Sequence, residues 1–176
     1  GKINNPGIYE VEMGITLKDL VESLGGGMKP GSTLHFIVSG GPSGGFLTPE
    51  HLDVPVDFDS LVEYGSIMGS GGLIVCDQHD DILDILQVFM KFNEEESCGK
   101  CTPCREGTSI MVDYLESFQQ KEATKQTLID MKKLGKMMQK ASLCGLGQAA
   151  PNPVFSALRY FQNKFEETLK DGEQNE

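Results

Sequence analysis

The chain has 176 residues, of which 39% are hydrophobic, and a formal net charge of −11. This length is enough for the core of one medium domain or two small ones, and the negative charge argues against nucleic acid or anionic lipid as a partner. No apolar run approaches the roughly 20 residues of a membrane span, and no signal-peptide pattern is present. We therefore expect a cytoplasmic protein without direct membrane insertion.

Residues 1–76 are rich in glycine and in short apolar runs, which is typical of a small α+β module. The apolar runs at 7–13, 34–38 and 72–76 predict three strands. A capping-box pattern begins at Thr16 and predicts a helix. The apolar face of this helix holds Leu17, Leu20, Val21 and Leu24.

From residue 77 onward, apolar residues recur at the period of amphipathic helices. Four helices are predicted from four groups of apolar residues. The first helix has Ile82, Leu83, Leu86 and Phe89 on its apolar face, and the second has Ile110, Met111, Leu115 and Phe118. The third has Leu128, Met131, Leu134 and Met138, and the fourth has Val154, Leu158, Phe161 and Phe165. Short connections between such helices favour a four-helix bundle over residues 77–170. The polar residues 171–176 are predicted to form a tail.

Three of the five cysteines, Cys98, Cys101 and Cys104, follow a C-x₂-C-x₂-C pattern. A disulfide framework would spread an even number of cysteines among loops, whereas this spacing lets three thiolates converge on one small inorganic group. A bacterial ferredoxin would have a further cysteine at position 108, where this chain has Thr108. The fourth ligand must therefore come from elsewhere in the chain.

Two cysteines remain as candidates for that fourth ligand. Cys144 lies between two predicted helices and is followed by Gly145 and Gly147, which allow the main chain to approach a cluster closely. Cys76 ends an apolar run and is more simply explained as a small buried side chain. We favour Cys144 and keep Cys76 as the alternative.

The split into three clustered ligands and one distant ligand favours an iron–sulfur cluster over zinc. Structural zinc normally takes its ligands as two separated pairs, whereas four thiolates are the usual ligands of a [4Fe–4S] cluster. His35, His51 and His79 are far in sequence from both cysteine groups, and we expect them to be structural or solvated. Zinc and redox-active thiols stay open as alternatives.

The residues around the cysteines suit an anionic cluster. Thr102 and Pro103 match the N-cap and first position of the second predicted helix, which would place Cys104 in its first turn near free N–H groups. Arg105 adds a positive charge, although an ordinary surface arginine is the alternative interpretation. Both features would stabilise the more negative reduced state and raise the reduction potential. We therefore predict that Thr102 and Arg105 tune the cluster.

The sequence contains no dinucleotide-binding fingerprint and no phosphate-binding loop. The glycine-rich stretches at 40–45 and 69–72 lack the helix that a phosphate cradle needs behind it. No Ser-His-Asp or Cys-His array stands out either. We predict no catalytic residue in this chain.

The stretch from Glu96 to Gly107, together with residues 144–148, resembles the flavoprotein (51 kDa-type) subunit of NADH:quinone oxidoreductase. The related subunits of NAD(P)-linked hydrogenases and formate dehydrogenases share this block. Residues 7–11, 40–46 and 69–72 resemble the soluble-ligand-binding β-grasp (SLBB) domain of the same family. Together these matches cover almost the whole chain.

The resemblance implies an SLBB-like β-grasp domain at 1–76 and a four-helix [4Fe–4S] domain at 77–170. In this family an upstream domain binds FMN and NAD(P)H, and single electrons leave the flavin through the cluster to the iron–sulfur centres of partner subunits. The first seven residues are typical of an interior segment, so we expect the flavin domain upstream in a longer parent protein, and no turnover by this chain alone. A small-ligand-binding module and a zinc-stapled interaction domain are the alternatives.

Overall fold

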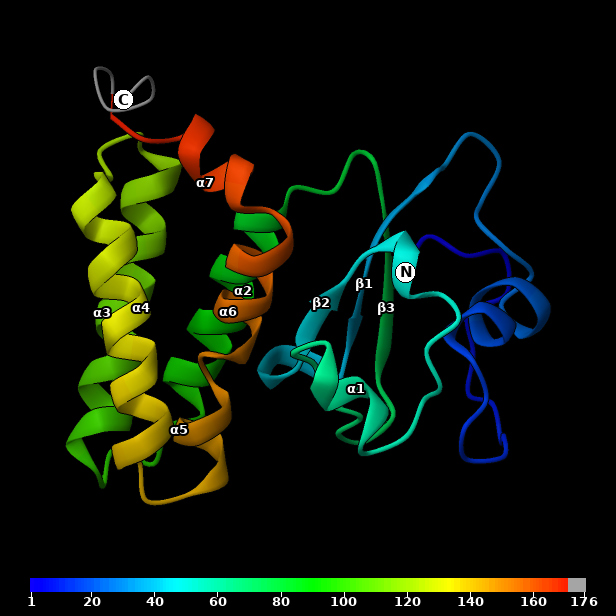
Figure 1. Ribbon diagram of the computed structural model, residues 1–176, viewed down its shortest axis with the longest axis horizontal. Coiled ribbons are helices and arrows are strands. Elements are labelled where there is room, and N and C mark those ends of the chain that lie inside the picture. The colour runs from blue at the N-terminus through cyan, green and yellow to red at the C-terminus, as the bar shows by residue number, and fades with distance from the viewer. Residues whose placement is uncertain (171–176) are drawn as a thin grey trace. The chain divides into compact units, whose positions relative to one another are not determined.

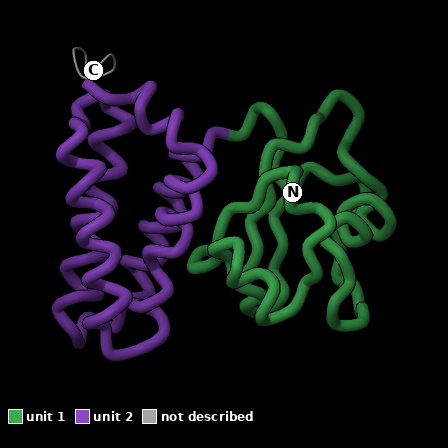
Figure 2. The backbone as a smooth tube through the Cα atoms, viewed as in Figure 1, with its two compact units in different colours: residues 1–80 green, residues 81–176 purple. Residues whose placement is uncertain are grey.

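The structure is a computed structural model that describes residues 1–170, and the predicted tail at 171–176 lies outside the described residues. The chain divides into two units, residues 1–80 and residues 81–176 (Figure 2). Helices and strands are both present, and the strands belong to the first unit (Figure 1). The predicted α+β class is thus confirmed, whereas the predicted domain bounds at 76 and 77 stay a prediction.

The strands of the first unit form one antiparallel sheet of order β2-β1-β3, with the bounds β1 Leu34–Ser39, β2 Gly45–Leu47 and β3 Leu73–Asp77. Ile37 of the central strand lies opposite Leu47 on one side and opposite Val75 on the other, and all three side chains are buried. Two of the three predicted strands, at 34–38 and 72–76, are confirmed.

The helical elements of the first unit are short: η1 Asp19–Leu24, η2 Gly41–Ser43, η3 Pro49–His51 and α1 Ser60–Glu63. The helix predicted after Thr16 is η1, which is π-helical. The Asp19 N–H donates to Thr16 Oγ1 at 3.0 Å, and the Thr16 hydroxyl donates back to the Asp19 carboxylate at 2.8 Å. Apolar side chains from this segment and from the sheet form one core: Leu17, Val21, Ile37, Leu47, Val54, Leu61 and Val75.

The strand predicted at residues 7–13 is not formed. This segment has no strand partner among the described residues, and Ile8 is fully exposed. The isolated bridges nearby, Ile3 with Met28 and Thr16 with Pro55, lie on either side of it. A strand is stable only where a neighbour pairs its main-chain N–H and C=O groups. The sequence pattern suits a strand, but residues 7–13 form no strand pairing within residues 1–170.

The second unit consists of helices, with the bounds α2 Ile82–Glu95, α3 Thr102–Gln119, α4 Lys125–Ala141, α5 Gly145–Ala149, α6 Asn152–Tyr160 and α7 Gln162–Glu167. Side-chain caps fix where two of them begin. Asp81 accepts the N–H groups of Leu83 and Asp84 before α2, and Thr124 accepts the N–H of Thr127 before α4. Throughout residues 1–170, no helix has the length and apolarity that crossing a membrane requires.

The last predicted helix differs from expectation. It is divided into α6 and α7 at Phe161, whose backbone angles of φ −133° and ψ 32° interrupt the helix. In addition, the short helix α5 follows directly after Cys144. The expected set of four uninterrupted helices is therefore corrected to three long helices followed by a broken segment.

Glycine allows α3 and α4 to approach each other closely. A Cβ added to Gly107 of α3 would lie 2.7 Å from Cγ of Met138 in α4, which is closer than side chains pack. At the other end of α3, Phe118 packs edge to face against Phe165 of α7, with ring centroids 5.3 Å apart. The amino end of α3 thus lies beside the carboxyl end of α4 (Figure 1).

Candidate metal centre

Cys98, Cys101 and Cys104 surround the first turn of α3. Cys98 is exposed in the loop before the helix, Cys101 is half-buried, and Cys104 is buried. Cys101 is the N-cap, with an extended backbone at φ −104° and ψ 134°, so Thr102 and Pro103 are the first two helical residues. The predicted N-cap at Thr102 is therefore wrong by one residue, but Cys104 does lie in the first turn.

The segment that carries Cys144 packs against this same turn. Cys144 is exposed and is the N-cap of α5, with φ −139° and ψ 170°. Its neighbour Leu143 donates its main-chain N–H to the sulfur of Cys101. A Cβ added to Gly147 would lie 2.8 Å from the Cβ of Cys104, so this close approach needs glycine. Contacts on both sides of Cys144 therefore hold it near Cys101 and Cys104.

Main-chain N–H groups favour the thiolate form of Cys101. The N–H of Leu143 contributes most and that of Cys104 next, and together they lower the pKa of Cys101 below its ordinary value. Burial acts in the opposite direction, and the Arg105 guanidinium adds a smaller lowering contribution. The thiolate is the form of cysteine that binds metals. The surrounding main chain therefore favours the form of Cys101 that can act as a metal ligand.

Ser97 contacts the site although the sequence pattern assigned it no role. Its Oγ lies 3.2 Å from Sγ of Cys104 and accepts the N–H of Gly99 at 3.3 Å. Gly99 has φ +71°, a left-handed conformation that glycine adopts without strain and that turns the loop between the first two cysteines. The available sequence signal for Ser97 is its position directly before the first cysteine.

Arg105 holds the cysteine loop in addition to carrying a charge. Its Nη1 donates to the carbonyl of Gly99 at 2.7 Å, and its Nε lies 2.8 Å from Oε1 of Glu106. Both side chains of this ion pair are about half exposed, so the pair contributes little stability and offsets part of the Arg105 charge. Thr102 is exposed at the start of α3. The tuning roles of Arg105 and Thr102 stay predictions.

The donor groups around α3 and α5 are of the kind that binds an iron–sulfur cluster. Within residues 1–170, no three His, Cys, Asp or Glu side chains are placed to hold one metal ion. A [4Fe–4S] cluster is bound differently, because it is a larger group that four separate thiolates bind. One buried hydroxyl without a partner among these residues, that of Ser142, lies beside Gly147 near Cys104. Cysteine sulfurs, inward N–H groups and a spare hydroxyl together fit such a cluster.

Cys76 has a different environment from the other cysteines. It lies in β3 of the first unit and is buried. Burial is the main reason that the pKa of Cys76 is raised to about 12, with the nearby Asp80 charge contributing. Cys76 is thus a neutral thiol at ordinary pH. The histidines also belong to the first unit, where His51 Nδ1 accepts the N–H of Thr48 at 3.0 Å in a structural role.

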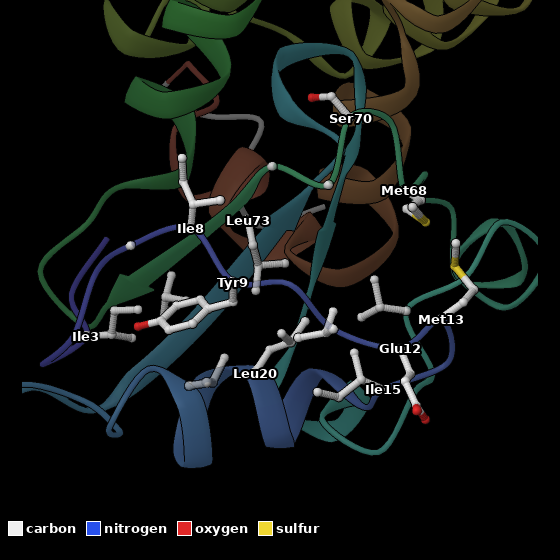
Figure 3. Close-up of a pocket in the computed structure, with 17 residues that line it drawn as sticks. Ile3, Ile8, Tyr9, Glu12, Met13, Ile15, Leu20, Met68, Ser70 and Leu73 are labelled. Carbon is white, nitrogen blue, oxygen red and sulfur yellow. The ribbon is translucent and has the colours of Figure 1, made fainter.

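A separate apolar pocket of about 640 Å³ lies in the first unit (Figure 3). Its lining side chains include Ile8, Tyr9, Met13, Leu20 and Leu73, with Glu12 as a charged member. The Tyr9 hydroxyl donates to the carbonyl of Asn5 and so holds this ring in place. Residues 7–13, for which the sequence predicts a strand, form part of the pocket wall.

Known families match both parts of the chain. Residues 84–168 match the NADH-ubiquinone oxidoreductase-F iron-sulfur binding region, and residues 1–47 match the SLBB domain. The chain is 40% identical over 171 residues to the NADP-reducing hydrogenase subunit HndC of Solidesulfovibrio fructosivorans, covering 97% of this chain and 35% of that protein. It is 40% identical over 172 residues to the F subunit of the NADH-quinone oxidoreductase of Streptomyces coelicolor, covering 96% of this chain and 37% of that one.

A solved structure shows the same likeness. The chain is similar to an NAD+-reducing [NiFe]-hydrogenase in the H2-reduced state, with a TM-score of 0.86 and 31% identity, over 97% of this chain and 28% of that one. The chain therefore spans about a third of the length of the relatives it matches. The family resemblance of the cysteine block and of the glycine-rich half is confirmed. The chain is thus similar to the F subunits of NADH-quinone oxidoreductases and to a related hydrogenase subunit, with an SLBB domain match at residues 1–47 and an iron–sulfur binding region match at residues 84–168.

Proposed function

We propose that this chain is the electron-transfer part of an NAD(P)H-linked oxidoreductase of the NADH dehydrogenase or NAD(P)-linked hydrogenase type. In this proposal one [4Fe–4S] cluster is held by Cys98, Cys101, Cys104 and Cys144. The observation that carries it is the packing of the Cys144 segment on the first turn of α3, through the Leu143 N–H and the close approach of Gly147. Cysteines far apart in sequence are thereby available to one group.

A bound cluster would supply one-electron transfer, and the residues of this chain would hold and tune it. The four thiolates would provide its ligands, and the N–H groups that already favour the Cys101 thiolate would offset negative charge. The Ser97 hydroxyl would remain hydrogen-bonded to the sulfur of Cys104. Arg105 would orient the cysteine loop through the Gly99 carbonyl and raise the reduction potential through its charge.

The chain is proposed to work inside a larger assembly. Its relatives are named as subunits and are nearly three times as long, which supports an upstream domain of the same parent protein that binds FMN and NAD(P)H. Electrons would pass from that flavin through this chain to a partner iron–sulfur subunit. We further propose an SLBB-like domain at 1–76, a bundle at 77–170 in which α6 and α7 act as the fourth helix, and a cytoplasmic location.

Anaerobic reconstitution with iron and sulfide tests this function. We expect a brown protein with four iron and four sulfide per chain, whose visible absorbance bleaches on reduction. Bound zinc in place of iron, at one ion per chain after the same treatment, would overturn the proposal and favour a zinc-stapled interaction domain. The same measurement on separately expressed Cys144→Ser protein tests whether the iron is bound by the proposed ligands.

The apolar pocket favours a second candidate function, the binding of an apolar small molecule by the first unit. Its volume of about 640 Å³ and its apolar lining are typical of small-molecule sites. A thermal-shift screen of apolar compounds on the iron-free chain tests this function. A compound that stabilises the chain equally with and without iron, and loses its effect in Leu20→Glu, would support it. No stabilisation by any compound would count against it.

A further inference from the structure

The hydroxyl of Ser142 is buried without a hydrogen-bond partner among residues 1–170, although the main chain of this residue is fully bonded. The residue is 5% exposed. Its N–H donates to the carbonyl of Met138 at 3.1 Å, and its carbonyl accepts from Nε2 of Gln148 at 3.0 Å. A buried polar group without a partner destabilises a fold, so this unpaired hydroxyl calls for a functional explanation.

The Ser142 hydroxyl lies among the residues that would hold the cluster. A Cβ added to Gly147 would be 2.6 Å from Oγ of Ser142 and 2.8 Å from Cβ of Cys104, so the hydroxyl and the Cys104 side chain flank the same glycine. Cys144 follows two residues later, and the N–H of the intervening Leu143 donates to Cys101. The hydroxyl is therefore an unused donor beside Cys104, next to the candidate site.

We propose that Ser142 is a further tuning residue, whose hydroxyl donates a hydrogen bond to a sulfur of the bound iron–sulfur cluster. This inference rests on the proposed function. A serine hydroxyl is a donor, and the sulfurs of an anionic cluster accept hydrogen bonds. The bond is stronger to the reduced cluster, which carries one more negative charge. Ser142 therefore raises the reduction potential, and its buried hydroxyl is satisfied only when the cluster is present.

The test compares Ser142→Ala and Ser142→Thr with a matched control, Ser156→Ala. Ser156 is also buried in the same unit, but its hydroxyl donates to the carbonyls of Asn152 and Pro153, both at 3.1 Å. Two quantities are measured for each reconstituted chain: the ratio of reduced to oxidised cluster at a fixed ambient potential, followed by electron paramagnetic resonance, and the melting temperature of the iron-free form.

We expect Ser142→Ala to lower the ratio of reduced to oxidised cluster about tenfold, which equals about 59 mV for a one-electron couple. The iron-free Ser142→Ala chain should melt at the wild-type temperature or higher, because the substitution removes an unsatisfied hydroxyl. Ser142→Thr keeps the hydroxyl and should keep the wild-type ratio. Ser156→Ala should leave the ratio unchanged and lower the melting temperature.

Full iron content with an unchanged ratio in Ser142→Ala would overturn this inference and leave the proposed function standing. A lower melting temperature of iron-free Ser142→Ala would also overturn it, because the hydroxyl would then serve the fold. If Ser142→Ala takes up no iron, recovery of iron in Ser142→Thr supports the inference and failure to recover it contradicts it. Absence of iron from the wild-type chain would instead overturn the proposed function.

Discussion

The main-chain N–H of Leu143 donates to the sulfur of Cys101, and this bond joins the two cysteine groups that are far apart in sequence. It places a residue next to Cys144 directly on the N-cap of α3. The bond also lowers the pKa of Cys101. One contact therefore contributes both to the geometry of the candidate site and to the charge state of a proposed ligand.

Exchange of cysteine for serine should lower the iron content at one position and leave it unchanged at the other. Cys144→Ser removes a proposed ligand, so we expect the chain to lose the cluster or to retain a three-iron form. Cys76→Ser alters a buried thiol in β3 of the first unit and should leave the iron content unchanged. Iron and sulfide analysis with electron paramagnetic resonance checks both. The reverse pair of results would show that Cys76 is the fourth ligand.

Gly147→Ala should reduce cluster uptake. The added Cβ would lie 2.6 Å from Ser142 Oγ and 2.8 Å from Cys104 Cβ, so α5 must move away from α3. Overpacking of this kind costs about 1–3 kcal/mol, and we expect a lower iron content and a lower melting temperature. Gly145→Ala is the matched control, because nothing lies within 4 Å of its added Cβ. Equal iron contents in the two variants would contradict the close packing described for α5.

The stability of the iron-free chain should fall at alkaline pH because of Cys76. Burial raises its pKa from an ordinary 9.0 to about 12, so the unfolded chain loses this proton at a lower pH than the folded chain. The stabilising contribution is complete below about pH 9 and is lost as the pH rises toward about 12. Relative to Cys76→Val, the wild-type free energy of unfolding should fall by about 1 kcal/mol between about pH 9 and pH 10. Urea unfolding of both chains at each pH measures this, and a constant difference would refute it.

The outer edge of β3 should exchange its amide protons quickly. Gly72 accepts the Gly40 N–H on the side of β1, and Val75 accepts the Lys2 N–H on the opposite side. Because main-chain groups alternate along a strand, the N–H of Leu73 faces away from β1, whereas that of Ile74 faces it. Hydrogen exchange followed by NMR should show Leu73 exchanging faster than Ile74 and slowing when the apolar pocket is filled. Equal protection of the two amides would mean that this edge is already paired.

Much of the candidate site could be predicted from local sequence, because cysteine spacing and helix periodicity are local properties. The predicted start of α3 differs by a single residue, since the extended backbone of Cys101, rather than the Thr102 side chain, begins the helix. The proposed role of Ser142 could not be predicted from the sequence, because it depends on the position of Ser142 beside Gly147 and Cys104 after α4 has folded back. The strand expected at 7–13 failed for the same reason, because strand formation requires a neighbouring strand that the local pattern does not reveal.

The close contact of Gly107 with Met138 fixes α3 against α4 just behind the cysteine-bearing segments. With Cys104 and Cys144 as ligands of one cluster, α4 would lie inside a closed covalent loop, like the loop that a disulfide closes. Such a loop lowers the entropy of the unfolded chain, and metal binding is then linked to folding. Loss of the cluster would open this loop and lower the stability of the helical unit, so oxidative damage to the iron–sulfur centre would also destabilise the fold that carries it.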